Sequence, residues 1–308
     1  MTALRSTRCI RLLAALVAIA SLSLLASPAQ AQQSFKSPDE AASALVAAVK
    51  SGMKQDVLKV LGSDGEDIID SGDDVADADA RAKFLSAYDA KNSLKVDGKK
   101  ASLVIGADDF PFPIPLIHNK TGWEFDTAEG RREILYRRIG RNELDAIQTC
   151  LAFVDAENEY AEKDRGDGVG IYARKIVSSP GKKDGLYWPS DSNDSPLGEL
   201  AASASAEGYK ASAEPQPYHG YYYRILTQQG ASALGGAMSY IVKGKMIGGF
   251  ALIAYPAEYG NSGVMTFMVN HAGTVYQKDL GQDTEARVKS MTSFDPDKTW
   301  KKVEVASP

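Results

Sequence analysis

The apolar positions after residue 31 first recur at helical spacing. Ser37 is a favourable N-cap, Pro38 suits the first helical position, and Glu40 completes a capping box. The apolar residues that follow fall at i, i+3, i+4, i+7 and i+8, and they are Ala41, Ala44, Leu45, Ala48 and Val49. The pattern predicts an amphipathic helix that ends at Gly52 and turns one face toward a core.

Shorter apolar patterns predict two further helices, over residues 54–61 and 79–91. The acidic stretch 63–79 lies between them and predicts a solvated loop. From residue 94 onward the apolar positions alternate with polar ones, which is typical of strands.

This alternation predicts four strands, which cover residues 94–96, 102–105, 110–117 and 123–126. Asp97-Gly98 is a tight-turn signal that joins the first two strands. The prolines of the third strand place it at a sheet edge, because proline cannot donate a hydrogen bond to a ladder. Helices followed by an antiparallel meander predict a small α+β domain over residues 32–126. The pattern is similar to the cone-like domains of the nuclear transport factor 2 superfamily, a likeness of fold that implies no activity.

The remaining residues, 127–308, open with a strongly helical stretch that reaches residue 164, with Gly140 as a candidate break. Its apolar stripe consists of Leu144, Ile147, Cys150, Leu151 and Val154. A short helix is predicted at 197–207. Five strands separated by turn residues follow, over 220–227, 237–242, 248–255, 264–270 and 273–277. We therefore expect a domain in which a long amphipathic helix packs on an antiparallel sheet, which completes an α+β protein.

Residues 1–31 have the three parts of a secretory signal peptide. Arg5, Arg8 and Arg11 precede an apolar run over residues 12–25, and Ala29-Gln30-Ala31 provides a cleavage site. The apolar run is shorter than the roughly 20 residues that a membrane-spanning helix needs, so a permanent anchor is the less favoured interpretation. We expect cleavage after residue 31, a periplasmic or secreted protein, and no membrane span after cleavage.

Charge argues against nucleic acid as a partner. Residues 1–31 hold three of the 35 Lys and Arg residues and none of the 40 Asp and Glu residues, which leaves a net charge of −8 on the remaining chain. Phosphate binding needs a concentrated basic surface. The one basic cluster consists of Arg131, Arg132, Arg137, Arg138 and Arg141. Acidic residues are interleaved with it at helical spacing, which predicts a solvated, ion-paired helix face.

Cysteine and histidine patterns give little support to a cofactor. Cys150 is the one cysteine beyond residue 31, and its place on the apolar stripe predicts a small buried residue and not a nucleophile. None of the three histidines pairs at metal-ligand spacing. Asp164 and Asp167, in a glycine-rich turn, match a fragment of a calcium loop that lacks its third carboxylate and terminal Glu. Calcium is the only cofactor left open, and a plain surface turn is favoured over it.

The candidate binding residues are aromatic. The sequence contains no nucleophile elbow, P-loop or dinucleotide fingerprint. Rings with polar tips gather at Tyr187, Trp188, Tyr218, His219, Tyr221 and Tyr223. Such side chains suit recognition of a glycan or a peptide. The alternative is that the tyrosines simply line both faces of a strand, with Tyr221 and Tyr223 on the same face.

Several segments match one exported bacterial family. They include Gly140-Arg-Asn-Glu-Leu-Asp-Ala-Ile147, Gly185-Leu-Tyr-Trp-Pro189, Tyr218-His-Gly-Tyr-Tyr-Tyr-Arg-Ile-Leu226 and Gly248-Gly-Phe-Ala-Leu-Ile-Ala-Tyr-Pro256. On these segments the chain resembles the family called domain of unknown function 2950, which implies export but no activity. The helix laid over a sheet is also weakly similar to the globular heads of type II secretion pseudopilins. A pilin keeps its apolar N-terminal helix, so we do not expect this chain to assemble into filaments.

These observations favour a non-catalytic protein that binds an envelope protein or a glycan through its C-terminal domain. The second hypothesis is a cell-wall hydrolase that uses His219 with Asp184 or Asp191. The third is a calcium-stabilised module associated with secretion. The sequence does not indicate an oligomeric state.

Overall fold

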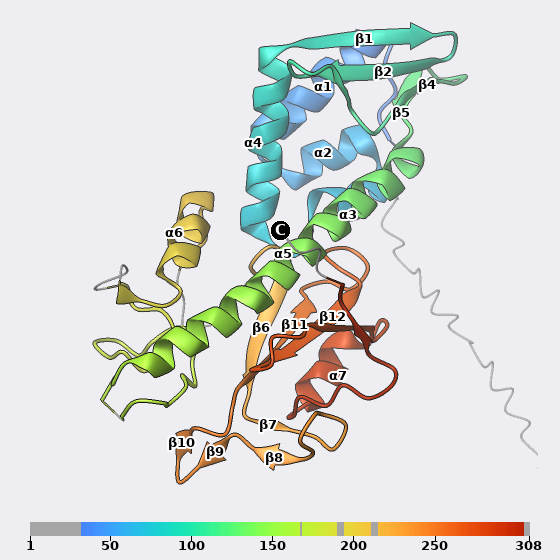
Figure 1. The fold of residues 1–308 in the computed structure, drawn as a ribbon. Helices are drawn as coiled ribbons and strands as arrows, with labels where there is room; N and C mark the ends of the chain where they lie inside the picture. The colour runs from blue at the N-terminus through green and yellow to red at the C-terminus, as the bar shows by residue number, and fades with distance from the viewer. Residues whose placement is uncertain (1–31, 167, 190–193, 211–214, 305–308) are drawn as a thin grey trace, which may run out of the picture.

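The structure, a computed structural model, describes residues 32–166, 168–189, 194–210 and 215–304. Buried apolar side chains form clusters at the two ends of one long helix, α5 (Thr127–Glu162) (Figure 1). The described residues combine helices with antiparallel sheets, so the predicted α+β class is confirmed.

Four helices and one 3-10 turn precede the first sheet: α1 (Pro38–Ser51), α2 (Lys54–Leu61), η1 (Ser63–Gly65), α3 (Glu66–Ile69) and α4 (Asp74–Ala90). The predicted cap of α1 is confirmed, because Ser37 Oγ accepts a hydrogen bond from the Glu40 N–H at 3.1 Å. Gly52 ends α1 with a φ of 69°, a left-handed conformation that glycine adopts without strain. The apolar face of α1 packs in the N-terminal core, as its spacing predicts.

The acidic stretch 63–79 is not the loop that its composition predicts. It contains η1, α3 and the first turn of α4, which begins at Asp74 and not at residue 79. The reason is the N-cap: Asp73 Oδ1 accepts hydrogen bonds from the N–H groups of Val75 and Ala76, at 3.2 and 3.1 Å. A carboxylate at this position satisfies donors that a helix start leaves open. The acidic residues therefore begin a helix.

The first sheet contains β1 (Asn92–Asp97), β2 (Lys100–Ile105), β3 (Phe110–Pro111), β4 (Leu116–His118) and β5 (Trp123–Phe125). Its strands are antiparallel in the order β1-β2-β4-β5, and β3 also pairs with β2. The Asp97-Gly98 turn is confirmed, since Asp97 pairs with Lys100. The single strand predicted over 110–117 is wrong: the prolines divide it into β3 and β4.

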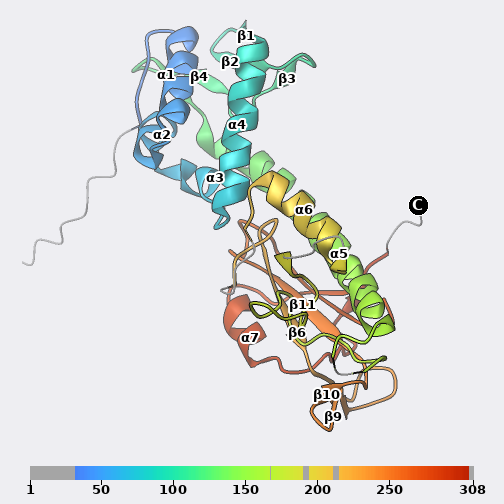
Figure 2. The same ribbon diagram turned by 90° about the vertical axis from the view of Figure 1, so that its left-hand side faces the viewer.

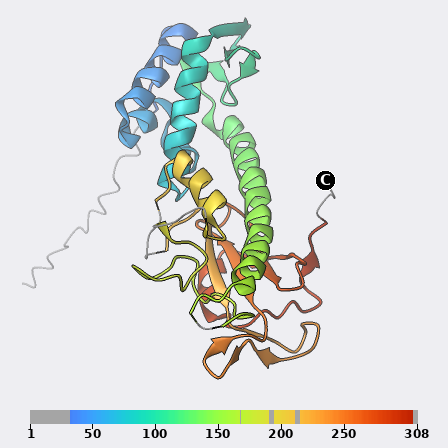
Figure 3. The ribbon, with the colours of Figure 1, turned by 60° about the vertical axis from the view of Figure 1, so that its left-hand side comes forward.

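Helix α5 runs from the N-terminal helices to the second sheet (Figure 3). It is continuous through Gly140, so the candidate break is absent, and its 36 residues span about 54 Å. Near its start the Thr127 hydroxyl donates to the Leu61 carbonyl at 2.6 Å, and Ile134 packs against the N-terminal core. The division of the chain at residue 126 stays a prediction.

The buried stripe of α5 differs from the predicted one at its first position. The centre of the buried face runs through Ala146, Cys150, Phe153 and Glu157, and Leu144 projects away from it and is 65% exposed. Cys150 is fully buried, as predicted, and burial raises the pKa of its thiol to about 12.

The second sheet contains β6 (Tyr221–Leu226), β11 (Ala251–Pro256), β12 (Met265–Asn270), β13 (Tyr276–Asp279) and β14 (Lys301–Lys302). All pairs are antiparallel, in the order β14-β13-β12-β11-β6. Helix α5 packs on β11 and β12, and α7 (Thr284–Ser290) lies on the other side of the sheet (Figure 2). The long helix on an antiparallel sheet is thus confirmed, and β6 is an edge strand.

Several of the C-terminal elements depart from prediction. The strand expected over 237–242 is split into β8 (Met238–Ser239), which pairs with β7 (Gln228–Gln229), and β9 (Ile241–Val242), which pairs with β10 (Lys245–Met246). The chain divides at Tyr240, whose buried hydroxyl donates to Gln229 Oε1 at 2.9 Å. Helix α7 and strand β14 were not predicted, because their apolar patterns are too short.

Glu157 is fully buried on α5, and its carboxylate has one donor, the Ala173 N–H at 2.8 Å. Burial raises the pKa of this carboxyl well above its usual 4.5. Between pH 4.5 and the raised value the folded state holds a proton that the unfolded state releases, so stability falls as pH rises through this window.

We expect Glu157→Gln to raise the free energy of unfolding at pH 7.5 and to change it little at pH 4. Urea unfolding at both pH values tests this, and equal effects at the two would contradict it.

Candidate functional site

The structure separates the six predicted aromatic residues into two groups. Trp188 and Tyr221 are 1% and 0% exposed, so they lie in the core and not on a binding surface. The Tyr221 hydroxyl donates to the Met265 carbonyl at 2.9 Å. Tyr187, Tyr218 and Tyr223 line a cavity, whereas His219 stacks behind Tyr218 with ring centroids 4.1 Å apart. The cavity is therefore the candidate site.

The cavity has a volume of about 910 Å³ and lies beside the free edge of the second sheet. One wall is formed by β6 (residues 222–225), and another by residues 174–180. Helix α6 (Gly198–Glu207), which confirms the helix predicted over residues 197–207, supplies Leu200, Ala201 and Ala204. Figure 1 shows α6 on the far side of β6 from β11. A mostly apolar cavity of this size is typical of ligand sites.

The tyrosines keep their protons at physiological pH. Burial raises the pKa of Tyr218 to about 12, and it also raises the pKa of Tyr209 and Tyr223 well above the usual 10. Their hydroxyls are therefore neutral groups that can both donate and accept hydrogen bonds. An apolar wall carrying such groups can hold an uncharged backbone or the hydroxyls of a sugar.

Among the residues that the structure describes, the charged side chains of the cavity wall are all basic: Arg174, Lys175, Lys210 and Arg224. Lys175 pairs with Asp184 at 2.8 Å, outside the wall. The Arg224 guanidinium donates to the carbonyls of Val288 and Met291, at 2.6 and 2.7 Å, and neither acceptor carries a formal charge. Arg174, Lys210 and Arg224 thus bring positive charge without an ion pair to the described wall, in a chain whose net charge is −5. That charge favours an anionic ligand.

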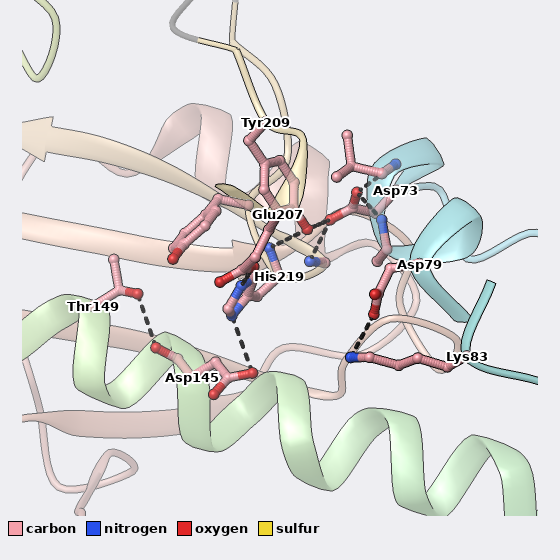
Figure 4. A network of polar contacts seen from close by, with 12 residues as sticks. Asp73, Asp79, Lys83, Asp145, Thr149, Glu207, Tyr209 and His219 are labelled. Atoms are coloured by element: carbon pink, nitrogen blue, oxygen red, sulfur yellow. Dashed lines mark hydrogen bonds and ion pairs between the residues drawn. The ribbon is translucent and has the colours of Figure 1, made fainter. Parts of the chain in front are cut away.

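His219 forms part of a polar network at one end of the cavity (Figure 4). Its Nε2 lies 2.5 Å from Glu207 Oε2, and its Nδ1 lies 3.1 Å from Asp145 Oδ2. His219 has a φ of 51°, the left-handed region, and it directly precedes Gly220. The adjoining backbone is fixed by Tyr209, whose hydroxyl accepts from the His219 N–H at 3.2 Å. Both imidazole nitrogens therefore face a carboxylate of this chain.

Asp73 connects this network to the N-terminal helices. Its carboxylate, 1% exposed, caps α4 through Oδ1, while Oδ2 accepts from the Tyr209 hydroxyl and the Gly220 N–H, both at 2.9 Å. Figure 4 shows Asp73 and Tyr209 meeting across this junction. Sequence reasoning missed Tyr209 and Asp73, because their contact joins residues 136 positions apart and leaves no local pattern.

The acid partners of His219 differ from the predicted ones. Asp184 binds Lys175 Nζ at 2.8 Å and the Ser179 N–H at 2.7 Å, so it does not serve His219. Those bonds lower the pKa of Asp184 to about 2, against the effect of its burial. Asp191 lies outside the described residues. The carboxylates that face His219 are Asp145 and Glu207, which come from α5 and α6.

The glycine-rich turn after α5 is closed by Asp164. Its Oδ1 accepts from the N–H groups of Gly166 and Gly168, both at 2.8 Å. Asp167, the other predicted calcium ligand, lies outside the described residues. Within the described ranges, no group of three or more His, Cys, Asp or Glu side chains is placed to hold a metal ion. Calcium binding stays a prediction.

The basic cluster of α5 is ion-paired in part. Arg137 Nε lies 2.6 Å from Glu133 Oε1, one helical turn away, and Arg131 pairs with Asp67. Arg138 departs from the predicted solvated face. It is half-buried and donates to the carbonyls of Asp67 and Ile68 and to Asn261 Oδ1. It joins α3 to the C-terminal part of the molecule.

Comparison with known families identifies the group to which these features belong. The family described as "Protein of unknown function (DUF2950)" matches residues 32–303, nearly the whole chain. The chain belongs to the DUF2950 family. Neither the curated proteins nor the solved structures gave a match.

The matched range of this DUF2950 protein includes the cavity, the His219 network and both cores. The likenesses to nuclear transport factor 2 cones and to pseudopilin heads are not shown by any comparison. Within the part of the chain that the structure describes, no helix is both long and apolar enough to cross a membrane.

Proposed function

We propose that this protein is a non-catalytic binding protein of the bacterial envelope and that it binds its partner in the cavity beside β6. The cavity carries the proposal: about 910 Å³ of mostly apolar space, tyrosine hydroxyls, and basic residues without an acidic one among the described residues of the wall. Export is supported by the signal-peptide pattern of residues 1–31.

The surroundings of His219 support binding over catalysis. A general base needs a free nitrogen within reach of the substrate. Here Nε2 contacts Glu207 at 2.5 Å, and Nδ1 is buried 3.1 Å from Asp145 Oδ2 without a hydrogen bond, so neither nitrogen is open to a ligand in the cavity. Within the described residues, His219 has no cysteine or serine partner, and it contacts carboxylates, tyrosines and backbone groups. The imidazole therefore acts in this proposal as a brace between α5 and α6.

Two tryptophan substitutions on α6 test the cavity. Ala204 lines it, whereas Ala202 is exposed and lies outside its wall. Ala204→Trp would fill the cavity, so we expect at least about tenfold less partner in crosslinked capture from the cell envelope, which corresponds to 1.4 kcal/mol of lost binding. Ala202→Trp is expected to capture as much as the wild type.

Circular dichroism of both variants would check that the fold is kept. Equal capture by Ala204→Trp and the wild type would contradict the proposal. So would turnover of a cell-wall substrate that His219→Ala abolishes while the fold is intact.

A further inference from the structure

The edge strand β6 presents backbone groups that the rest of the described chain does not use. Tyr221 exchanges two backbone hydrogen bonds with Tyr218, at 2.8 and 3.1 Å, on the side away from β11. Hydrogen-bonding direction alternates along an antiparallel strand. The N–H and C=O groups of Tyr223 and Ile225 therefore point to that same side. Within the described ranges they have no backbone partner there.

The unused stretch is closed at both ends. Tyr218 occupies the edge next to Tyr221, and beyond Leu226 the Thr227 carbonyl accepts from the Tyr240 N–H at 2.9 Å. Four backbone groups thus remain between two blocked positions. At about 3.3 Å per residue, the open edge suits an extended segment of about five residues.

A strand added at this edge would lie inside the cavity. Neighbouring strands lie about 4.8 Å apart, and β6 itself forms a wall of the cavity through residues 222–225. Successive side chains of the added strand would point to opposite faces of the sheet. One set would face Thr149 and Phe153 of α5, and the other would lie on the face that carries Tyr222 and Arg224. Helix α6 and residues 174–180 form the other walls, so the space admits one strand and not the edge of a second sheet.

Charge indicates the character of the added strand. Arg174 and Lys210 line the cavity and are exposed, and within the described ranges no carboxylate lies at ion-pair distance from either. Arg224 adds a third positive charge, Lys175 is neutralised by Asp184, and the described part of the wall holds no Asp or Glu. Complementary charge selects partners and speeds their encounter.

We propose that β6 takes up an extended, acidic segment of a partner protein as a sixth strand of the C-terminal sheet. The proposal rests on the proposed binding function and names its partner class. Backbone hydrogen bonds to Tyr223 and Ile225 supply affinity, as in other strand-addition complexes, and the tyrosine-lined walls receive alternate apolar side chains. Acidic side chains of the segment meet the basic residues at the cavity rim.

The first experiment is selection from a phage-displayed library of random dodecapeptides. The target is the protein produced from the full 308-residue chain, and the Ala204→Trp variant serves for counter-selection. We expect the selected peptides to carry net negative charge and to bind the wild type and Ala202→Trp at least about tenfold more tightly than Ala204→Trp. Absence of enrichment over Ala204→Trp, or enrichment of basic peptides, would overturn the proposal.

The second experiment reads the strand edge directly by amide hydrogen exchange. A selected peptide should slow exchange at Tyr223 and Ile225, and it should leave Tyr222 and Arg224, which already bond to β11, nearly unchanged. N-methylation of the peptide N–H groups that point toward β6 should weaken binding about tenfold, whereas N-methylation of the N–H groups in between should not weaken it. Protection without this alternation would overturn strand addition.

The two proposals fail separately. An acidic oligosaccharide or a fatty acid captured in the cavity, without protection of Tyr223 and Ile225, would leave the binding function intact and overturn the added strand. Loss of all capture would overturn both.

Discussion

Replacing Asp73 with alanine is expected to lower the free energy of unfolding by about 4 kcal/mol. The buried carboxylate accepts four hydrogen bonds: two from the first turn of α4, one from the Tyr209 hydroxyl and one from the Gly220 N–H. Alanine would leave all four donors without their acceptor in a site that water does not reach. Loss of a helix cap alone costs about 1 kcal/mol. The remainder comes from the junction between the two ends of the molecule, and urea unfolding measures the total.

Asp73→Asn separates the two roles. An amide oxygen can still cap α4, but the amide NH₂ would face the Gly220 N–H, which is also a donor. We expect this variant to lose roughly half as much stability as Asp73→Ala. Asp79 is the matched control, because it lies on the same helix and forms an exposed pair with Lys83 at 2.7 Å (Figure 4). Asp79→Ala should cost less than about 0.5 kcal/mol. Similar losses in Asp73→Ala and Asp79→Ala would refute this account.

The second large effect is expected at Arg138. Its guanidinium donates to the Asp67 carbonyl at 2.6 Å and to Asn261 Oδ1 at 2.5 Å, and a further bond reaches the Ile68 carbonyl. Arg138→Met keeps the length of the side chain but removes these donors from a half-buried site. We expect the free energy of unfolding to fall by about 2–3 kcal/mol.

Arg137 provides the comparison for this variant. It precedes Arg138 on α5, but it is exposed and pairs with Glu133 within the helix. Arg137→Met removes this pair and the cation–π contact with Phe110, whose ring centroid lies 4.9 Å from the guanidinium carbon, and should cost about 1 kcal/mol or less. Thermal melting of both variants at the same pH would check the difference, and an equal loss would show that Arg138 does not hold the two ends together.

Features specified by neighbouring residues could be predicted from the sequence. The cap of α1 needs only Ser37 and Glu40, and the β1–β2 turn needs only Asp97 and Gly98. The long helix α5 was predicted because residues 127–164 are strongly helical and carry an apolar stripe over residues 144–154. In the acidic stretch 63–79, by contrast, the same composition suits a loop and a helix start, and the position of Asp73 decides between them.

The candidate site depends on contacts that no local pattern records. Tyr218 and Tyr223 were singled out for their rings, yet their place in a cavity depends on α6 and on residues 174–180. Tyr221 was grouped with them, and it shares a face of β6 with Tyr223, but alternation cannot tell where along that face the core ends and the cavity begins. The carboxylate partners of His219 lie 74 and 12 residues away along the chain, so their pairing becomes visible only once the chain is folded.

The 36-residue helix α5 has a consequence for how such a protein can change over generations. Its first turns contribute to one core, and its later turns, from Ala146 to Tyr160, contribute to the other. A deletion or a gene fusion that keeps only one half leaves a strip of apolar side chains without cover, and either fragment would aggregate. We therefore expect recombination to exchange this unit whole and not to shuffle its halves, and the range that the family matches, residues 32–303, includes both halves of the helix.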